Sequence, residues 1–145
     1  MTTQRVVLAA VAVALVALAA CAPRVTETRA PLPEAQVFDA SREAVHQVII
    51  ERLNADGWVL KQSDVAGGFI SAEKSLTVTT VRGLMGTSIE SIHTQALSFV
   101  TSAVGDATRV LIQGGATRNE DFNERVVPTA FAVMEDLAKE FGTPE

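Results

Sequence analysis

The chain has 145 residues, which suffices for one compact domain with a short segment added to it. Its 17 acidic and 12 basic residues give a formal net charge of −5, and an acidic protein repels phosphate backbones. These numbers argue against nucleic-acid binding and against electrostatic attraction to anionic lipid. The single cysteine excludes a disulfide within the chain.

The first segment has the pattern of an export signal. Arg5 precedes an uninterrupted apolar run from Val6 to Ala20, which ends at Cys21. A membrane-spanning helix needs about 20 apolar residues, and this run is shorter. We therefore interpret residues 1–20 as a signal peptide, with a buried core helix as the alternative. Cys21 is interpreted as a chemical handle rather than a structural or reactive thiol, since the sequence around it offers neither a base nor an oxyanion site.

The end of the apolar run resembles the bacterial lipobox, and the residues that carry the resemblance are Leu18, Ala19, Ala20 and Cys21. The resemblance implies signal-peptidase recognition of the first three residues and cleavage before the cysteine. It also implies attachment of a diacylglycerol and an acyl chain such as palmitate to Cys21. A single acyl chain is a marginal anchor, whereas two or three hold a protein on a bilayer stably. An aspartate directly after the cysteine resembles a signal for retention in the inner membrane. This position is Ala22, so we expect the protein to be anchored at the periplasmic face of the outer membrane.

A proline-bearing polar segment follows the cysteine. Residues 21–37 carry prolines at positions 23, 31 and 33, and this composition is typical of an extended, semi-stiff tether. The remaining residues 38–142 suffice for a single core. The sequence therefore predicts a lipidated cysteine with a tether, followed by one domain.

The domain begins with a predicted helix. Val45, Ile49 and Leu53 recur every fourth residue, and Gly57 is suited to the end of the helix. His46 lies beside this apolar stripe and is expected to face solvent.

The hydrophobic period then changes from 3.6 to 2, which predicts strands. Strands are expected over residues 58–62 and 69–74, in the Thr- and Val-rich residues 75–82, and twice within residues 93–117. Trp58 is expected to be buried against the helix. A second helix is expected over residues 127–142, with an apolar stripe formed by Ala130, Phe131, Met134, Leu137, Ala138 and Phe141.

These elements predict an α+β fold in the order α-β-β-β-β-β-α. Strands joined by short turns pair antiparallel. A sheet of four to five such strands with one apolar face can be covered by the two helices, packed on that face.

A second resemblance concerns residues 37–74, where a helix ends in Gly57-Trp58 and a hairpin follows. This pattern resembles small helix-grip lipoprotein domains of the kind found in the C subunit of the outer-membrane barrel-assembly machinery. The resemblance implies an envelope lipoprotein domain. Those proteins carry two such domains and this sequence has one, so no binding residues are carried over.

Motifs for catalysis or metal binding are not assembled in the sequence. His93 has no neighbouring His, Cys or regularly spaced carboxylate, whereas a catalytic zinc normally takes three protein ligands. The acidic run Asn119–Glu124 is interpreted as solvated surface charge that suits a helix N-terminus. We therefore expect no enzymatic activity, no cofactor and no metal.

The sequence favours a non-enzymatic envelope adaptor or scaffold that binds other envelope proteins. Residues 83–92 are expected to form an exposed apolar loop that contains Gly83 and Gly86, and exposed apolar residues often mark interfaces. The candidate contact residues are Leu84, Met85 and Ile89, with packing onto the core as the alternative for them. The alternative function is a carrier that binds a small hydrophobic ligand between the sheet and the helices.

Overall fold

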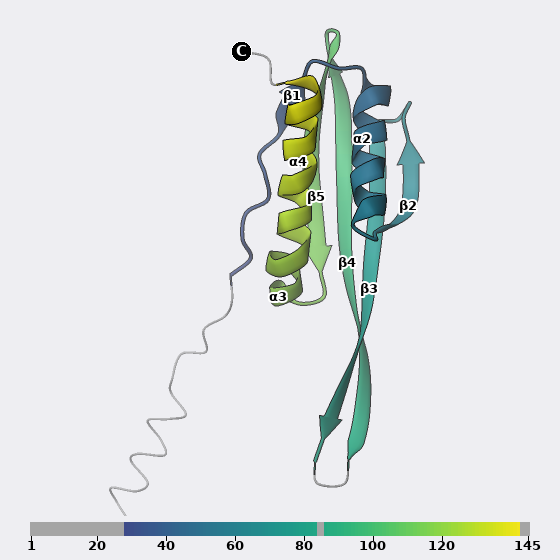
Figure 1. Ribbon diagram of the computed structural model, residues 1–145, viewed down its shortest axis with the longest axis vertical. Coiled ribbons are helices and arrows are strands. Elements are labelled where there is room, and N and C mark those ends of the chain that lie inside the picture. The colour runs from purple at the N-terminus through teal and green to yellow at the C-terminus, as the bar shows by residue number, and fades with distance from the viewer. Residues whose placement is uncertain (1–27, 84–85, 143–145) are drawn as a thin grey trace, which may run out of the picture.

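The computed structural model describes residues 28–83 and 86–142. A five-stranded antiparallel sheet carries two long helices on one face (Figure 1), which confirms the predicted α+β class. The strands are β1 (Gln36–Phe38), β2 (Val59–Asp64), β3 (Phe69–Arg82), β4 (Thr87–Val104) and β5 (Ala107–Ala116). The helices are α2 (Arg42–Ala55), the short α3 (Asn119–Asp121), the π-helical turn η1 (Phe122–Val126) and α4 (Val127–Phe141).

The order of strands in the sheet is β1-β5-β4-β3-β2. Three of its strands differ from the expected ones. Strand β4 begins at Thr87, before the residues 93–117 in which it was expected. The second and third expected strands form one continuous strand, β3, which pairs with β4 from Phe69↔Val100 to Arg82↔Thr87. The fifth strand is β1, whose residues Gln36 and Val37 were expected to lie in the tether.

The segment before β1 lies against the domain. The Arg29 guanidinium donates to Asn119 Oδ1 (2.7 Å) and to the Ala116 carbonyl (3.0 Å), and it lies 4.9 Å from the centre of the Phe122 ring. The Ala30 N–H donates to Asn123 Oδ1 at 2.7 Å. The folded part therefore includes residues 28–30, because polar side chains of α3 and η1 satisfy backbone groups that a proline-rich segment cannot pair within itself.

Helix α2 forms as its sequence predicts, with one correction. The Ser41 hydroxyl accepts a hydrogen bond from the Ala44 N–H, which caps the helix, and Gly57 follows its end with φ 74°. His46 was expected to face solvent, but it is 1% exposed. It lies three residues before Ile49 at the border of the apolar stripe, and its Nε2 lies 2.8 Å from Thr101 Oγ1 on β4. This partner makes burial of a polar ring tolerable.

The core lies between the sheet and the two helices. Trp58 is buried, as predicted. On α4 the buried residues are Ala130, Val133, Met134 and Leu137, whereas Phe131 is half-exposed. The spacing of three and four residues defines the buried stripe of an α-helix, and Phe131 lies outside it. The main buried aromatic and aliphatic residues of the other elements are Phe38, Val45, Ile49, Leu53, Ile70, Leu97, Phe99 and Val110.

Candidate functional site

Strands β3 and β4 extend well beyond the rest of the sheet and form a projecting two-stranded hairpin (Figure 1). The pairing of β2 with β3 ends at Val59↔Glu73, and the pairing of β5 with β4 ends at Gln95↔Ala116. We call the projecting residues Ser75–Arg82 and Thr87–His93 the arm. Within the described residues, neither helices nor a third strand cover the distal part of the arm.

The local sequence explains why the arm forms. Residues 75–82 are rich in threonine and valine, whose branched side chains favour extended backbone. At the tip, Gly83 and Gly86 have φ values of 83° and 67°, which glycine adopts without steric cost. The Gly86 N–H donates to the Gly83 carbonyl at 3.2 Å, and this bond closes the turn.

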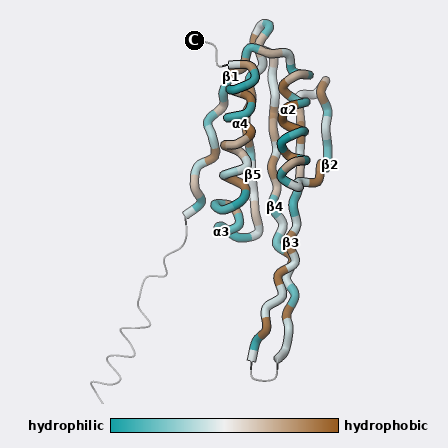
Figure 2. Tube along the Cα trace, in the orientation of Figure 1, coloured by the Kyte–Doolittle hydropathy of each residue, from teal (hydrophilic) through white to brown (hydrophobic). Residues whose placement is uncertain are grey.

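The arm exposes large aliphatic side chains on both of its faces. Val81 and Ile92 are 66% and 67% exposed, and Ile89 is 49% exposed. Alternation along the paired strands places Val81 and Ile92 on one face, and Ile89 on the face that continues the core. Figure 2 shows hydrophobic stretches that alternate with polar ones along the arm.

Of the contact and anchor residues predicted from the sequence, only Ile89 lies within the described residues. Ile89 is exposed, but it lies in strand β4 rather than in a loop. Leu84 and Met85 lie at the tip between the described glycines and are outside the described residues. The expected lipid-attachment residue Cys21 and the expected recognition residues Leu18, Ala19 and Ala20 also lie outside them.

A row of polar side chains lies where the arm joins the sheet. Asp121 Oδ2 in α3 lies 3.1 Å from His93 Nδ1, and His93 Nε2 lies 3.3 Å from Ser91 Oγ. The Ser91 hydroxyl also lies 3.3 Å from the Val78 carbonyl on β3. His93 and Asp121 are nearly buried. The row therefore links α3 to both strands of the arm.

The sequence did not predict this row, and Asp121 was wrongly interpreted as surface charge. Two signals were present: Ser91 and His93 are two residues apart on one strand face, and an acidic residue follows β5. Their pairing requires the return of α3 onto β4, which sequence spacing does not reveal.

The order of groups resembles the nucleophile, base and orienting carboxylate of acyl-transfer enzymes. Acyl transfer also needs N–H donors aimed at the developing oxyanion. Among the described residues, the groups in contact with Ser91 Oγ are the Val78 carbonyl and the His93 ring, and neither is a backbone N–H. We therefore interpret the row as a structural connection.

Gln95 continues this face of β4 into the core. It is fully buried, and within the described residues neither its amide nitrogen nor its amide oxygen has a hydrogen-bond partner. Unpaired buried polar groups are costly, so Gln95 is expected to lower the stability of the fold at the root of the arm.

The buried His46 lies at the opposite end of the sheet from the arm. Burial of the ring, and secondarily the positive charge of Arg42, lower the pKa of His46 below its usual value, while Asp64 opposes this effect. The ring is therefore neutral at pH 7, where it forms its hydrogen bond with Thr101.

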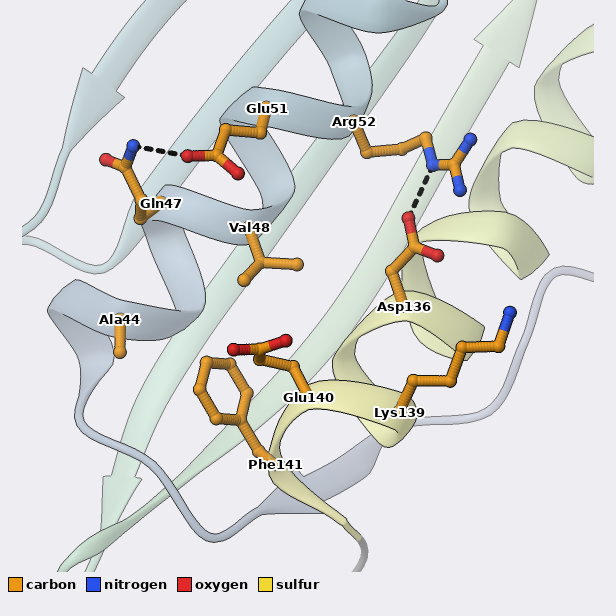
Figure 3. Close-up of a pocket in the computed structure, with 9 residues that line it drawn as sticks. All are labelled: Ala44, Gln47, Val48, Glu51, Arg52, Asp136, Lys139, Glu140 and Phe141. Atoms are coloured by element: carbon orange, nitrogen blue, oxygen red, sulfur yellow. Dashed lines mark hydrogen bonds and ion pairs between the residues drawn. The ribbon is translucent and has the colours of Figure 1, made fainter.

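A groove of about 560 Å³ lies between α2 and α4, and Figure 3 shows the side chains around it. Arg52 Nε donates to Asp136 Oδ2 at 2.5 Å across the groove. This hydrogen bond is the main reason that the pKa of Asp136 lies below its usual value and that the pKa of Arg52 lies above its own. The other side chains around the groove are Ala44, Gln47, Val48, Glu51, Lys139, Glu140 and Phe141. With Arg52 and Asp136, five of the nine side chains around the groove are charged, which suits a solvated surface better than a site for a hydrophobic ligand.

Two features of the described residues bear on the chemistry. No cluster of three or more His, Cys, Asp or Glu side chains that could hold a metal ion occurs among them. In residues 28–83 and 86–142 there is also no helix with the length and apolar character needed to cross a membrane.

Comparison with known proteins gives little further information. No family model matches the chain, and no curated protein matches it. Among solved structures, the chain is similar to a DUF4468 family protein from Bacteroides ovatus, with 14% sequence identity and a TM-score of 0.40. The similarity covers 78% of this chain and 91% of that chain. A similarity of this degree carries no functional argument, so the interpretation of the arm depends on its own geometry.

Proposed function

We propose that the protein is a lipoprotein of the bacterial envelope that acts as a non-enzymatic adaptor and binds another envelope protein through the arm. In this proposal, Cys21 carries the lipid anchor at the periplasmic face of the outer membrane. The lipobox-like residues before Cys21 support the anchor, and the projecting arm supports the adaptor role.

The single observation that carries the adaptor role is the exposure of the arm. An isolated two-stranded hairpin is at best marginally stable in water. Exposing Val81, Ile89 and Ile92 on such a hairpin adds an unfavourable contact with water that a bound protein would remove. A binding surface explains why the chain carries aliphatic side chains there.

The adaptor role is favoured over a carrier by the packing of the core. Fully buried side chains from α2 and β4, including Ile49, Leu53, Leu97 and Phe99, lie between the sheet and the helices, where the carrier would need a cavity. Native mass spectrometry of the protein from Ala22 onwards is expected to give the mass of the polypeptide alone. A retained hydrophobic ligand would favour the carrier.

The arm is tested by changing its aliphatic side chains. Ile89→Ser and Ile92→Ser, in the full-length chain, are expected to abolish co-purification of the partners that the wild type retains after chemical cross-linking. Val104→Ser is the matched control, because Val104 is an aliphatic residue as exposed as Ile89 (49%) at the opposite end of β4 from the arm. The adaptor role of the arm would be contradicted if both arm variants still co-purified with the same partners and unfolded at the same midpoint as the wild type.

The anchor is tested separately with Cys21→Ala. The wild type is expected to fractionate with the outer membrane, to lack residues 1–20 and to carry the added mass of acyl chains. The variant is expected to lack the acyl mass and to leave the membrane fraction. A wild-type protein that retains Met1 or an unmodified Cys21 thiol would contradict the anchor.

A further inference from the structure

The hydrogen bonds between β3 and β4 determine which backbone groups of the arm point outward. The Thr101 N–H donates to the Gly68 carbonyl at 2.8 Å, and the register then continues unbroken to Arg82↔Thr87. Along an antiparallel pair of strands, residues alternate between two arrangements. One residue exchanges both of its backbone hydrogen bonds with the opposite residue, and the next turns its N–H and C=O groups away from the partner strand. Every second residue of β3 from Gly68 thus bonds to β4. The residues between them turn their N–H and C=O groups to the outer edge of the arm: Ser75, Thr77, Thr79 and Val81.

The same alternation assigns the other edge of the arm. The Thr117 N–H donates to the Thr94 carbonyl at 2.9 Å. The N–H and C=O groups of the even-numbered residues of β4 therefore point towards the side on which β5 lies. In the arm, β5 is absent from that side. The N–H and C=O groups of Ser88, Glu90 and Ile92 therefore point outward along this second edge.

The two edges differ in their protection against pairing. Natural proteins protect open strand edges with charged residues, prolines or bulges. The β4 edge carries the exposed Glu90. The β3 edge from Ser75 to Val81 has no charged residue, no proline and no glycine, and its register with β4 has no bulge. Its composition favours the addition of a further strand.

We propose that the outer edge of β3 from Ser75 to Val81 binds an extended segment of the partner protein as an additional strand. This inference rests on the proposed adaptor function. An added strand continues the row of β2, whose pairing with β3 ends at Glu73, and it satisfies the outward N–H and C=O groups. Within the described residues, no strand pairs with this edge.

The edge also defines the chemistry of the segment that it binds. The side chains next to the added strand are Leu76, Val78 and Thr80 on one face, and Thr77, Thr79 and Val81 on the other. An uncharged segment rich in β-branched residues packs against them. Arg82 is exposed just beyond the tip end of the edge, so an acidic residue is expected to flank the uncharged segment on that side.

The charges of the arm disfavour a second copy of the chain as the occupant. Antiparallel pairing of this edge with itself about Val78 places Lys74 of one copy opposite Arg82 of the other. Pairing about Thr79 places Arg82 opposite Leu76. The first register brings two positive charges together, and the second places a charge against an aliphatic side chain. Both are unfavourable cross-strand pairs.

The experiment uses two proline substitutions on opposite residues, because Thr79 lies opposite Glu90. Thr79→Pro removes one outward N–H of the β3 edge, and Glu90→Pro removes one of the β4 edge. Neither removes a hydrogen bond between β3 and β4, and an edge strand tolerates proline where the N–H points to solvent. The full-length protein carries a photo-reactive phenylalanine derivative at position 77, and adducts are formed in intact cells.

The expected result is a heterologous adduct whose cross-linked peptide is an uncharged segment rich in β-branched residues. Thr79→Pro is expected to lower its yield by about tenfold or more, whereas Glu90→Pro changes it by less than about twofold. Equal effects of the two prolines, an adduct with twice the mass of the chain, or no adduct would overturn the proposal. Thr79→Lys, a charge of the kind that protects natural edges, gives the same comparison if the proline variant unfolds.

Hydrogen exchange gives the second readout, on the purified complex with the cross-linked partner. Amide protons of Thr77, Thr79 and Val81 are expected to exchange at least about tenfold more slowly in the complex than in the free protein, while those of Ser88 and Ile92 are unchanged. If Thr79→Pro binds normally but Ile89→Ser and Ile92→Ser do not, the adaptor function stands and strand addition is wrong. If every variant retains the partner, both are wrong.

Discussion

His93 Nδ1 on β4 lies 3.1 Å from Asp121 Oδ2 in α3, although the two residues are 28 positions apart in the sequence. The contact fixes the short α3 turn to the root of the arm. Both side chains are nearly buried, so the carboxylate of Asp121 depends on the His93 ring for a polar neighbour.

We therefore predict that Asp121→Asn lowers the free energy of unfolding by about 1–3 kcal/mol, the usual cost of a buried polar group that loses its partner. Urea denaturation measures this change. Glu120→Gln is the matched control, because Glu120 is the preceding residue and pairs with Arg118 on the surface. Equal stability of the two variants would show that the contact between His93 and Asp121 makes no net contribution.

A pH-dependent loss of stability is predicted from His46. Its pKa is lowered in the folded state by burial, so the unfolded state binds a proton more readily. The stabilising contribution is complete above the unfolded pKa of about 6.5 and is lost as the pH falls toward the folded pKa, by at most about 1.4 kcal/mol per pH unit.

The measurement compares the wild type with His46→Gln by urea denaturation at pH 7.5 and 5.5. The wild type is expected to lose more stability than the variant over this interval. Parallel losses would mean that His46 does not titrate differently in the two states.

A third prediction concerns the tight approach of two strands at Gly68. A Cβ atom at this residue would lie 2.1 Å from the Thr101 carbonyl oxygen, and φ is 70°. Gly68→Ala is therefore expected to destabilise the fold through both clash and backbone strain. Gly105→Ala is the control, since φ is 62° there but no atom lies within 4 Å of the added carbon. We expect about 1–2 kcal/mol for the control and a larger loss for Gly68→Ala. The order of the unfolding midpoints checks this prediction.

The fourth prediction concerns the Arg52–Asp136 contact between α2 and α4. Its hydrogen bond holds the pKa of Asp136 below the usual value, so its contribution is present above the unfolded pKa of about 3.9 and is lost as the pH falls through the folded pKa. Both side chains are partly exposed, and solvent screening limits the contribution to about 0.5–1 kcal/mol. Asp136→Asn is expected to show this loss at pH 7 in thermal denaturation, whereas Glu135→Gln, in the exposed pair with Lys139, is expected to show none. Equal midpoints for the two variants would contradict the prediction.

The fold class could be predicted from the sequence because its signals are local. The stripe of Val45, Ile49 and Leu53 defines α2, and alternation defines the strands. Strand β1 could not be predicted in this way. It has three residues and belongs to the sheet only because β5 offers a free edge for Gln36 and Val37, which is a tertiary property.

The site was predictable in part. The apolar character of Ile89 and Ile92 is visible in the sequence, but their place on a projecting strand depends on where β2 and β5 end. His46 and Asp121 were assigned wrongly for the same kind of reason. Each is a polar residue whose partner comes from a distant element, and hydrophobic periodicity carries no information about such partners.

The contacts of Arg29 and Ala30 with α3 and η1 have a geometric consequence for an anchored protein. They fix the incoming chain at the end of the domain from which the arm projects, close to Asn119 and Asn123. A fully extended chain spans at most about 3.6 Å per residue, so the eight steps from Cys21 to Arg29 reach no farther than about 29 Å. If Cys21 carries the proposed lipid, this end of the domain lies within about 29 Å of the bilayer. Membrane-bound proteins and segments emerging from the bilayer are then the molecules that can meet the arm.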